Sequence, residues 1–232
     1  DGTSVFIKNK WGNFYSGALA WNASEEDFLK GNHTVSNLRV RLSAGEVGNA
    51  NVPTSGSYAQ LYSTGYTFDK DLSIGQAPAS LANENLTWEK TLEYNLGVEL
   101  GMFDNRLNFN LDLYDKTTRD LLLEAPVLNI SGYTKAWQNI GKLRNRGIEF
   151  SMNADIVNRK DFKWSFNANA SRNWSKILEL GQNGAPIYLG ITCVGGNNGV
   201  ILREGGSIGE LFGYRAIGLY TYDEFNSYFD PA

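Results

Sequence analysis

Residues 91–116 read TLEYNLGVELGMFDNRLNFNLDLYDK, and this stretch decides the fold. Apolar side chains occupy every second position before the pair Asp104–Asn105 and again after it, and mostly polar residues or glycines fill the gaps. A period of two is typical of a strand with one apolar and one polar face, because successive side chains point to opposite sides. The pair in the middle is a turn signal, so the stretch predicts a β-hairpin with a tight turn.

The length of this hairpin separates two interpretations. Each arm alternates for about ten residues, whereas strands of soluble proteins usually stop at about five or six. A tilted strand of about 9–11 residues crosses a bilayer. One face in lipid and one in a wet lumen gives the alternation seen here. The hairpin alone is also compatible with a soluble antiparallel sandwich.

The same alternation recurs along the chain, in residues 13–22, 37–48, 147–156 and 163–174. Arg39 and Arg41 stand on the polar side of the second of these stretches, which suits a wet lumen better than the core of a sandwich. Trp164 and Trp174 share a face and lie ten residues apart. For a tilted strand that spacing corresponds to about 25 Å along the membrane normal, the height of the apolar band of a barrel.

The connections between these stretches alternate in length. Short to medium connections cover 23–36, 103–106 and 157–162, and long ones cover 49–90, 117–146 and 175–207. An outer-membrane barrel has short periplasmic turns and long extracellular loops, whereas a sandwich predicts no such alternation. We treat residues 49–90 as a long functional loop, because they show no sustained periodicity.

The predicted strands are fewer than the roughly eight of the smallest closed bacterial barrels. Open strand edges cannot lie in lipid, because every backbone polar group there must be hydrogen-bonded. The sequence therefore predicts an all-β fold that is a partial segment of a large antiparallel transmembrane β-barrel, with residues 1–232 in one barrel domain. The opening DGTSVFIKN carries neither a starting Met nor a signal peptide, and we interpret the chain as a piece of a longer protein.

The composition excludes several classes of function. A net charge of -4 argues against nucleic acid as a partner. His33 and Cys193 are the only residues of their kinds, so a histidine-based triad or a zinc site is nearly excluded. No apolar run approaches the roughly 18–20 residues of a membrane helix. No catalytic residue, metal site or cofactor is predicted.

The alternation assigns side chains to two faces. We expect these side chains to face lipid: Leu96, Val98, Leu111, Phe150, Trp164 and Phe166. We expect these to face the lumen: Arg39, Arg41, Glu93, Asn95, Glu99, Asp112, Glu149, Asp155 and Asn167. The carboxylates could suggest a glycosidase pair. Lining a wet lumen and pairing with the two arginines explains them better.

Aromatic side chains in the long connections are candidate contacts for a ligand or a lid protein: Tyr58, Tyr62, Tyr66, Tyr133 and Trp137. Rigid aromatic residues are enriched at binding hot spots and can stack on sugar rings. Packing of the loops against themselves is an equal alternative explanation.

Segments spread over nearly the whole chain resemble the later barrel strands of SusC/RagA-type TonB-dependent transporters. The most specific phrases are NENLTWEKT at 83–91, QNIGKLRNRGIE at 138–149 and IGELFGYRAIGLY at 208–220. Longer stretches, such as residues 1–30 and 161–180, match in the same order and spacing.

This resemblance implies a bacterial outer-membrane barrel of about 22 strands, plugged by an N-terminal domain. It also implies a SusD-like lipoprotein lid and import of oligosaccharides or peptides, driven through TonB. The plug, the TonB-contacting segment and the closing strands do not fall within these residues. Two alternatives remain: a siderophore or cobalamin receptor of the same architecture, and a secreted all-β carbohydrate-binding module.

Overall fold

The computed structural model describes residues 1–68, 71–79, 81–127, 129–133, 135–181, 184–189, 199–213 and 218. Cys193 and part of the phrase at 208–220 lie outside these residues.

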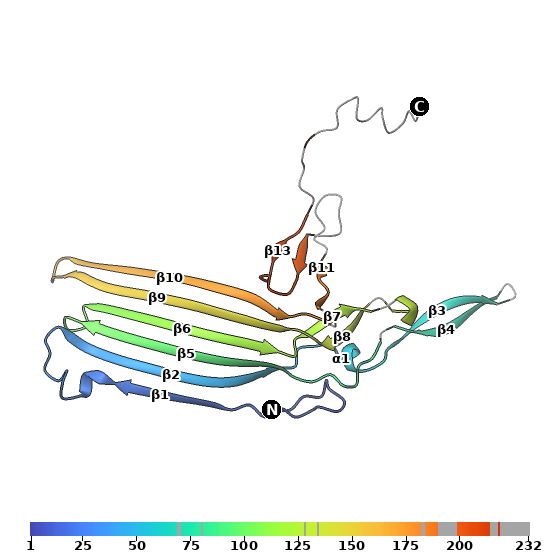
Figure 1. The fold of residues 1–232 in the computed structure, drawn as a ribbon, viewed down its shortest axis with the longest axis horizontal. Coiled ribbons are helices and arrows are strands. Elements are labelled where there is room, and N and C mark those ends of the chain that lie inside the picture. The colour runs from blue at the N-terminus through green and yellow to red at the C-terminus, as the bar shows by residue number, and fades with distance from the viewer. Residues whose placement is uncertain are drawn as a thin grey trace.

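A six-stranded antiparallel sheet dominates the structure (Figure 1). Its strands, in spatial order, are β1 (Ser16–Asn22), β2 (Val35–Asn49), β5 (Glu89–Met102), β6 (Leu107–Arg119), β9 (Lys142–Asn158) and β10 (Lys163–Glu179). The strands predicted from the alternation are confirmed, and the hairpin of residues 91–116 is the β5–β6 pair. Residues 103–106 form its turn, in which Asp104 and Asn105 have φ of 54° and 59°. Aspartate and asparagine adopt such left-handed conformations more readily than most residues.

β9 and β10 extend furthest beyond the stretches in which their sequences alternate. β9 and β10 each have 17 residues, and β9 begins at Lys142 rather than near Gly147. Residues 142–146 read KLRNR and are polar on both sides of the strand, apart from Leu143. A period of two is invisible where the two faces have similar polarity, so these residues carry no strand signal.

The two ends of the sheet differ in their connections. Figure 1 shows short links at one end, which we call the turn end: residues 23–34, 103–106 and 159–162. The long connections leave from the opposite end, which we call the loop end: residues 50–88, 120–141 and the chain after Glu179. The predicted alternation of short and long connections is therefore confirmed.

The long connections contain structure of their own. They hold α1 (Thr54–Ser57), the hairpin β3 (Leu61–Phe68) with β4 (Asp71–Pro78), the hairpin β7 (Leu122–Pro126) with β8 (Lys135–Asn139), and a small sheet of β11 (Ile187–Leu189), β12 (Val200–Leu202) and β13 (Glu210–Leu211). Among the described residues, 3₁₀ turns lie at Asn129–Ser131 in a long connection and at Ala23–Glu25 in the short link 23–34.

Treating residues 49–90 as a loop without regular structure was therefore wrong. The β3–β4 hairpin projects from the loop end, and its apolar side chains are exposed, with Leu72 at 76% and Ile74 at 82%. A hairpin with no buried face does not need one apolar and one polar side, so the alternation that marks the main sheet is absent from its sequence.

The largest cluster of buried apolar side chains lies at the loop end and consists of Phe6, Val52, Leu86, Trp88 and Leu122. Phe6 and Phe14 meet the Trp88 ring edge-on, with centroid distances of 5.9 and 5.5 Å. Large apolar side chains of the main sheet are instead exposed. This distribution differs from a sandwich, in which the sheet itself carries the core. None of the described helices is long and apolar enough to cross a membrane.

Candidate functional site

The strand register sorts the side chains of the sheet into rows that run across it. One row joins Arg41, Gly97, Asp112 and Glu149 on β2, β5, β6 and β9. The neighbouring row joins Val40, Val98, Leu111 and Phe150. Since adjacent rows point to opposite sides of a sheet, the first belongs to a polar face and the second to an apolar face.

Arg41 lies near the centre of the polar face. Its Nε is 3.0 Å from Glu99 Oε1, and its Nη2 donates a hydrogen bond of 3.3 Å to Asp112 Oδ1. The guanidinium crosses β5 over Gly97, where a Cβ would lie 2.9 Å both from Arg41 Nη2 and from Asp112 Oδ1. Glycine at this position therefore allows one side chain of β2 to reach β6.

Tyr114 repeats this arrangement two strands away. Its hydroxyl donates a 2.8 Å hydrogen bond to Asn173 Oδ1 on β10, and its ring crosses β9 over Gly147. A Cβ at Gly147 would lie 2.4 Å from Tyr114 Cζ. In both places a glycine opens a path for a long polar side chain, so the polar face is bound together across strands that are not neighbours.

Smaller polar contacts complete this face. Lys116 Nζ lies 3.2 Å from Glu93 Oε2, and Asn110 Nδ2 donates to Ser151 Oγ at 3.3 Å. A shallow depression of about 310 Å³ lies beside them, lined by Asn110, Asp112, Glu149, Phe150, Ser151, Asn169, Ala170 and Ser171. The Nε atoms of Arg39 and Arg41 are buried and have no hydrogen-bond partner among the described residues. The contact of Arg41 Nε with Glu99 is thus an ion pair without hydrogen-bond geometry.

The register places the residues expected in the lumen on this polar face: Arg39, Arg41, Glu93, Asn95, Glu99, Asp112, Glu149, Asp155 and Asn167. The residues expected to face lipid lie on the apolar face: Leu96, Val98, Leu111, Phe150, Trp164 and Phe166. Trp164 and Trp174 are 52% and 48% exposed there. Which face meets lipid and which a lumen stays a prediction.

The loop end brings three of the five candidate aromatic residues together. Tyr62, Tyr133 and Trp137 line one depression of about 380 Å³, beside the ion pair of Lys135 and Glu124 at 3.4 Å. Trp137 also packs against the buried cluster, so part of its role is structural. Tyr58 follows α1, and Tyr66 covers Gly75 within the β3–β4 hairpin; neither lines this depression.

Asparagines that sequence reasoning did not single out hold the loop end together. Asn139 accepts a 2.9 Å hydrogen bond from the backbone of Thr87 and donates to the carbonyls of Thr87 and Asp120 at 2.8 and 3.0 Å. Asn83 donates to the carbonyl of Trp137 at 3.0 Å. These side chains fix residues 81–88 beside β8. Partners about fifty residues apart in the chain leave no local signal in the sequence.

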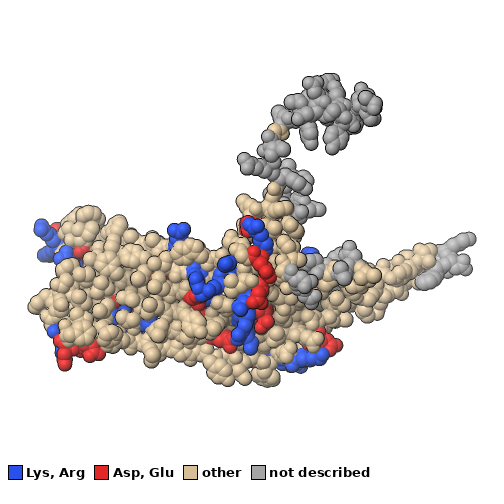
Figure 2. Space-filling model, viewed as in Figure 1, with Lys and Arg blue, Asp and Glu red and all other residues tan. Residues whose placement is uncertain are grey.

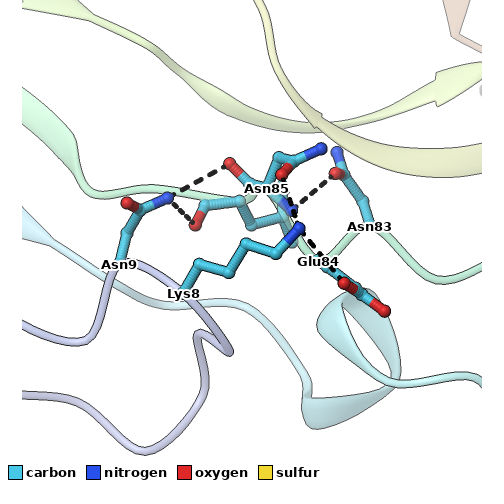
Figure 3. A network of polar contacts seen from close by, with 6 residues as sticks. Lys8, Asn9, Asn83, Glu84 and Asn85 are labelled. Carbon is cyan, nitrogen blue, oxygen red and sulfur yellow. Dashed lines mark hydrogen bonds and ion pairs between the residues drawn. The ribbon is translucent and has the colours of Figure 1, made fainter.

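A second group ties the N-terminal segment to the same place (Figure 3). Asn9 Nδ2 donates to the carbonyls of Asn85 and Leu86 at 3.4 and 3.1 Å. Lys8 Nζ lies 3.2 Å both from Asn85 Oδ1 and from Glu84 Oε2. The phrase NENL of residues 83–86 therefore supplies the contacts by which two distant segments meet.

Among the described residues, no group of three or more His, Cys, Asp or Glu side chains could hold a metal ion. Asp112 and Glu149 are register partners, but Asp112 is hydrogen-bonded to Arg41. The geometry of the polar face is that of a hydrogen-bonded polar wall.

Residues 1–199 match the family of TonB dependent receptor-like β-barrels. This match covers most of the chain, and the chain belongs to that family. The fold is accordingly a partial segment of a TonB-dependent receptor barrel, an architecture of receptors and transporters.

Individual relatives sharpen this assignment. The TonB-dependent receptor SusC of Bacteroides thetaiotaomicron is 34% identical over 234 residues, which cover 97% of this chain and 23% of SusC. A TonB-dependent receptor of Formosa agariphila is 38% identical over 231 residues, which cover 97% of this chain and 23% of that receptor. The chain thus spans less than a quarter of the length of these relatives.

Solved structures agree. The closed-closed state of the RagAB peptide importer matches 88% of this chain and 22% of that chain with a TM-score of 0.78 and 29% identity. Its open-open state matches with a TM-score of 0.75. The predicted resemblance to SusC/RagA-type TonB-dependent transporters is therefore confirmed.

Proposed function

We propose that this chain forms part of the barrel wall of a TonB-dependent importer in the bacterial outer membrane, with residues 1–232 in one barrel domain. The similarity to SusC over 97% of the chain carries this proposal. The single sheet with exposed apolar side chains is the arrangement that a barrel wall requires, because lipid removes such a face from water without a second layer of protein.

In this proposal the apolar face meets lipid and the polar face lines the lumen. The polar face holds the Arg41 network, the Tyr114–Asn173 bond and the Asn- and Ser-lined depression. Groups that hydrogen-bond across strands suit a surface that contacts water, a plug or a passing solute. TonB acts through the plug, which lies outside these residues.

The imported solute is an oligosaccharide or a peptide, taken up together with a SusD-like lipoprotein that covers the loop end. The RagAB structures are those of a peptide importer, which supports the peptide class. The depression of Tyr62, Tyr133 and Trp137 supports a contact at the loop end, since aromatic faces serve both sugar rings and protein partners.

Cysteine labelling tests the orientation. In the full-length protein with Cys193 replaced by Ser, the variants Ser131→Cys and Asn105→Cys place one thiol at the loop end and one at the turn end. A membrane-impermeant maleimide added to intact cells should label position 131 and miss position 105. Labelling of position 105 alone would mean that the barrel is inverted.

Deletion of the complete gene in its own bacterium tests transport. Uptake of labelled oligosaccharides or of labelled peptides should fall to background and return on complementation, and a surface lipoprotein should co-purify with the complete protein. Loss of siderophore or cobalamin uptake, with oligosaccharide and peptide uptake intact, would contradict the proposal and favour the alternative receptor class.

A further inference from the structure

The apolar face carries charged side chains close to the loop end. The row of Leu42, Leu96, Leu113 and Ile148 ends at Arg172, and the next row joins Tyr94, Asp115, Arg146 and Trp174. One row further on, Thr117, Arg144 and Lys176 are register neighbours. Charged side chains therefore stand on the apolar side of the strands, where the alternation of the central rows places only apolar groups.

Asp115 organises the middle of this group. Its carboxylate accepts hydrogen bonds from Arg144 Nε and Nη2 at 2.9 and 2.5 Å and from Arg146 Nε at 3.0 Å. One carboxylate thus holds two guanidinium groups side by side. Since it neutralises only one of them, the arrangement keeps an excess positive charge in a fixed position.

Two further cations flank this group on β10. Arg172 stacks over the Trp174 ring, with its Cζ 5.1 Å from the ring centroid, and both Arg172 and Lys176 are exposed. In the described part of the chain, no carboxylate lies within ion-pair distance of either. Arg144, Arg146, Arg172 and Lys176 carry four positive charges and Asp115 one negative charge, so this set has a net charge of +3. We call these four basic side chains the basic belt.

Its surroundings fit the boundary between hydrocarbon and headgroups. Tyr94 and Trp174 share the row of Arg146, and tyrosine and tryptophan are enriched where a membrane meets water. Figure 2 shows red and blue side chains gathered near the loop end, a largely tan stretch of the sheet beside them, and further charged side chains at the tip of the turn end. The described strand positions of the apolar face in its turn-end half hold no Lys or Arg, so the basic side chains of this face are confined to its loop-end half.

We propose that the basic belt binds the phosphate-bearing headgroup of an anionic lipid in the membrane leaflet at the loop end. This inference rests on the proposed function, because it requires the apolar face to meet lipid. Guanidinium groups recognise phosphate oxygens with paired hydrogen bonds, and Asp115 already aligns two of them. The belt spans about 5 Å across two strands and about 13 Å along them, enough for more than one phosphate.

Surroundings other than lipid headgroups suit the four cations of the belt less well. Hydrocarbon cannot solvate four cations, and long basic side chains near the end of an apolar band extend to the headgroups. The balanced pairs beside it, Arg119 with Glu46 and Lys142 with Glu179, need no external anion. The unbalanced charge of the belt itself lies on β9 and β10, and there an anionic headgroup supplies the missing partner.

The test uses the full-length protein in nanodiscs of phosphatidylcholine with or without phosphatidic acid. The triple variant Arg146→Gln, Arg172→Gln and Lys176→Gln keeps the bond between Arg144 and Asp115. A matched control, Lys10→Gln, Lys30→Gln and Lys160→Gln, removes the same charge from exposed positions off the belt. Binding is measured as retention of phosphatidic acid by native mass spectrometry.

The triple variant should lose at least about tenfold in retention, because each basic side chain at an anionic surface changes binding by roughly fivefold. The control should retain the lipid as the wild type does. The single variant Lys176→Gln should lose part of the retention. It still tests the proposal if the triple variant does not fold.

Equal retention by wild type and the belt variants would overturn the lipid site. Complete displacement by millimolar inorganic phosphate would also overturn it, since the belt would then be a free-anion site. Failure of the wild type to insert into nanodiscs would instead overturn the proposed function. Insertion is scored separately, by the shift in electrophoretic mobility between heated and unheated samples.

Discussion

The two faces of the six-stranded sheet come from the same strands and satisfy their side chains in different ways. On the polar face, Arg41 and Tyr114 reach across an intervening strand over Gly97 and Gly147. On the apolar face, the central rows hold side chains such as Val98, Leu111 and Phe150, for which none of the described contacts is polar. One face is stabilised by its own hydrogen bonds, and the other depends on what surrounds it.

This difference shows how a single layer can be specified without a core of its own. A soluble sheet buries one face against a second layer. Here the largest buried cluster lies at the loop end, and the apolar face is left for an apolar environment. Substitutions that place a charge on the apolar face should therefore cost more folding stability than substitutions that weaken single contacts.

The largest effect is expected from charge on the apolar face. Val98→Arg lies midway between the levels of Trp164 and Trp174 and should destabilise the full-length barrel by about 2–4 kcal/mol, the cost of Arg near the membrane midplane. Asn167→Arg on the polar face should cost far less. Leu96→Arg should fall between them, because its row already contains Arg172, a member of the basic belt.

Stability is measured by denaturant titration of the barrel folded into lipid vesicles, with the shift in electrophoretic mobility as the readout. Equal costs for Val98→Arg and Asn167→Arg would contradict the assignment of the faces.

A smaller effect is expected from closing a glycine path on the polar face. Gly147→Ala places a Cβ against the Tyr114 ring and should cost about 1–3 kcal/mol, the usual range for overpacking. In a Tyr114→Ala background the same change should cost almost nothing. The double-mutant cycle isolates this coupling, and additive costs would show that Gly147 serves another purpose.

The smallest effect is expected from the ion pair of Glu93 and Lys116, whose side chains are 33% and 39% exposed. Glu93→Gln should cost less than about 1 kcal/mol, because ion pairs that remain in contact with water contribute little. The same vesicle titration, repeated at low and high salt, checks this. A loss as large as that of Val98→Arg would mean that the pair is shielded from water.

The sequence by itself determined the main strands, their two faces, the alternating connections and the family. A period of two records which side of a strand each residue faces, and that information is local. The start of β9 was not predicted, because residues 142–146 are polar on both sides of the strand. The β3–β4 hairpin was not predicted, because neither of its faces is buried.

Tertiary structure alone decided which side chains meet. The contacts of Asp115 with Arg144 and Arg146, of Tyr114 with Asn173 and of Asn139 with Thr87 join residues about thirty to sixty positions apart. Such contacts depend on strand order and register, which the alternation within one strand does not encode. The basic belt is of this kind: each of its charges is an ordinary strand residue in the sequence, and only the pairing of β9 with β10 brings them together near the loop end of the apolar face.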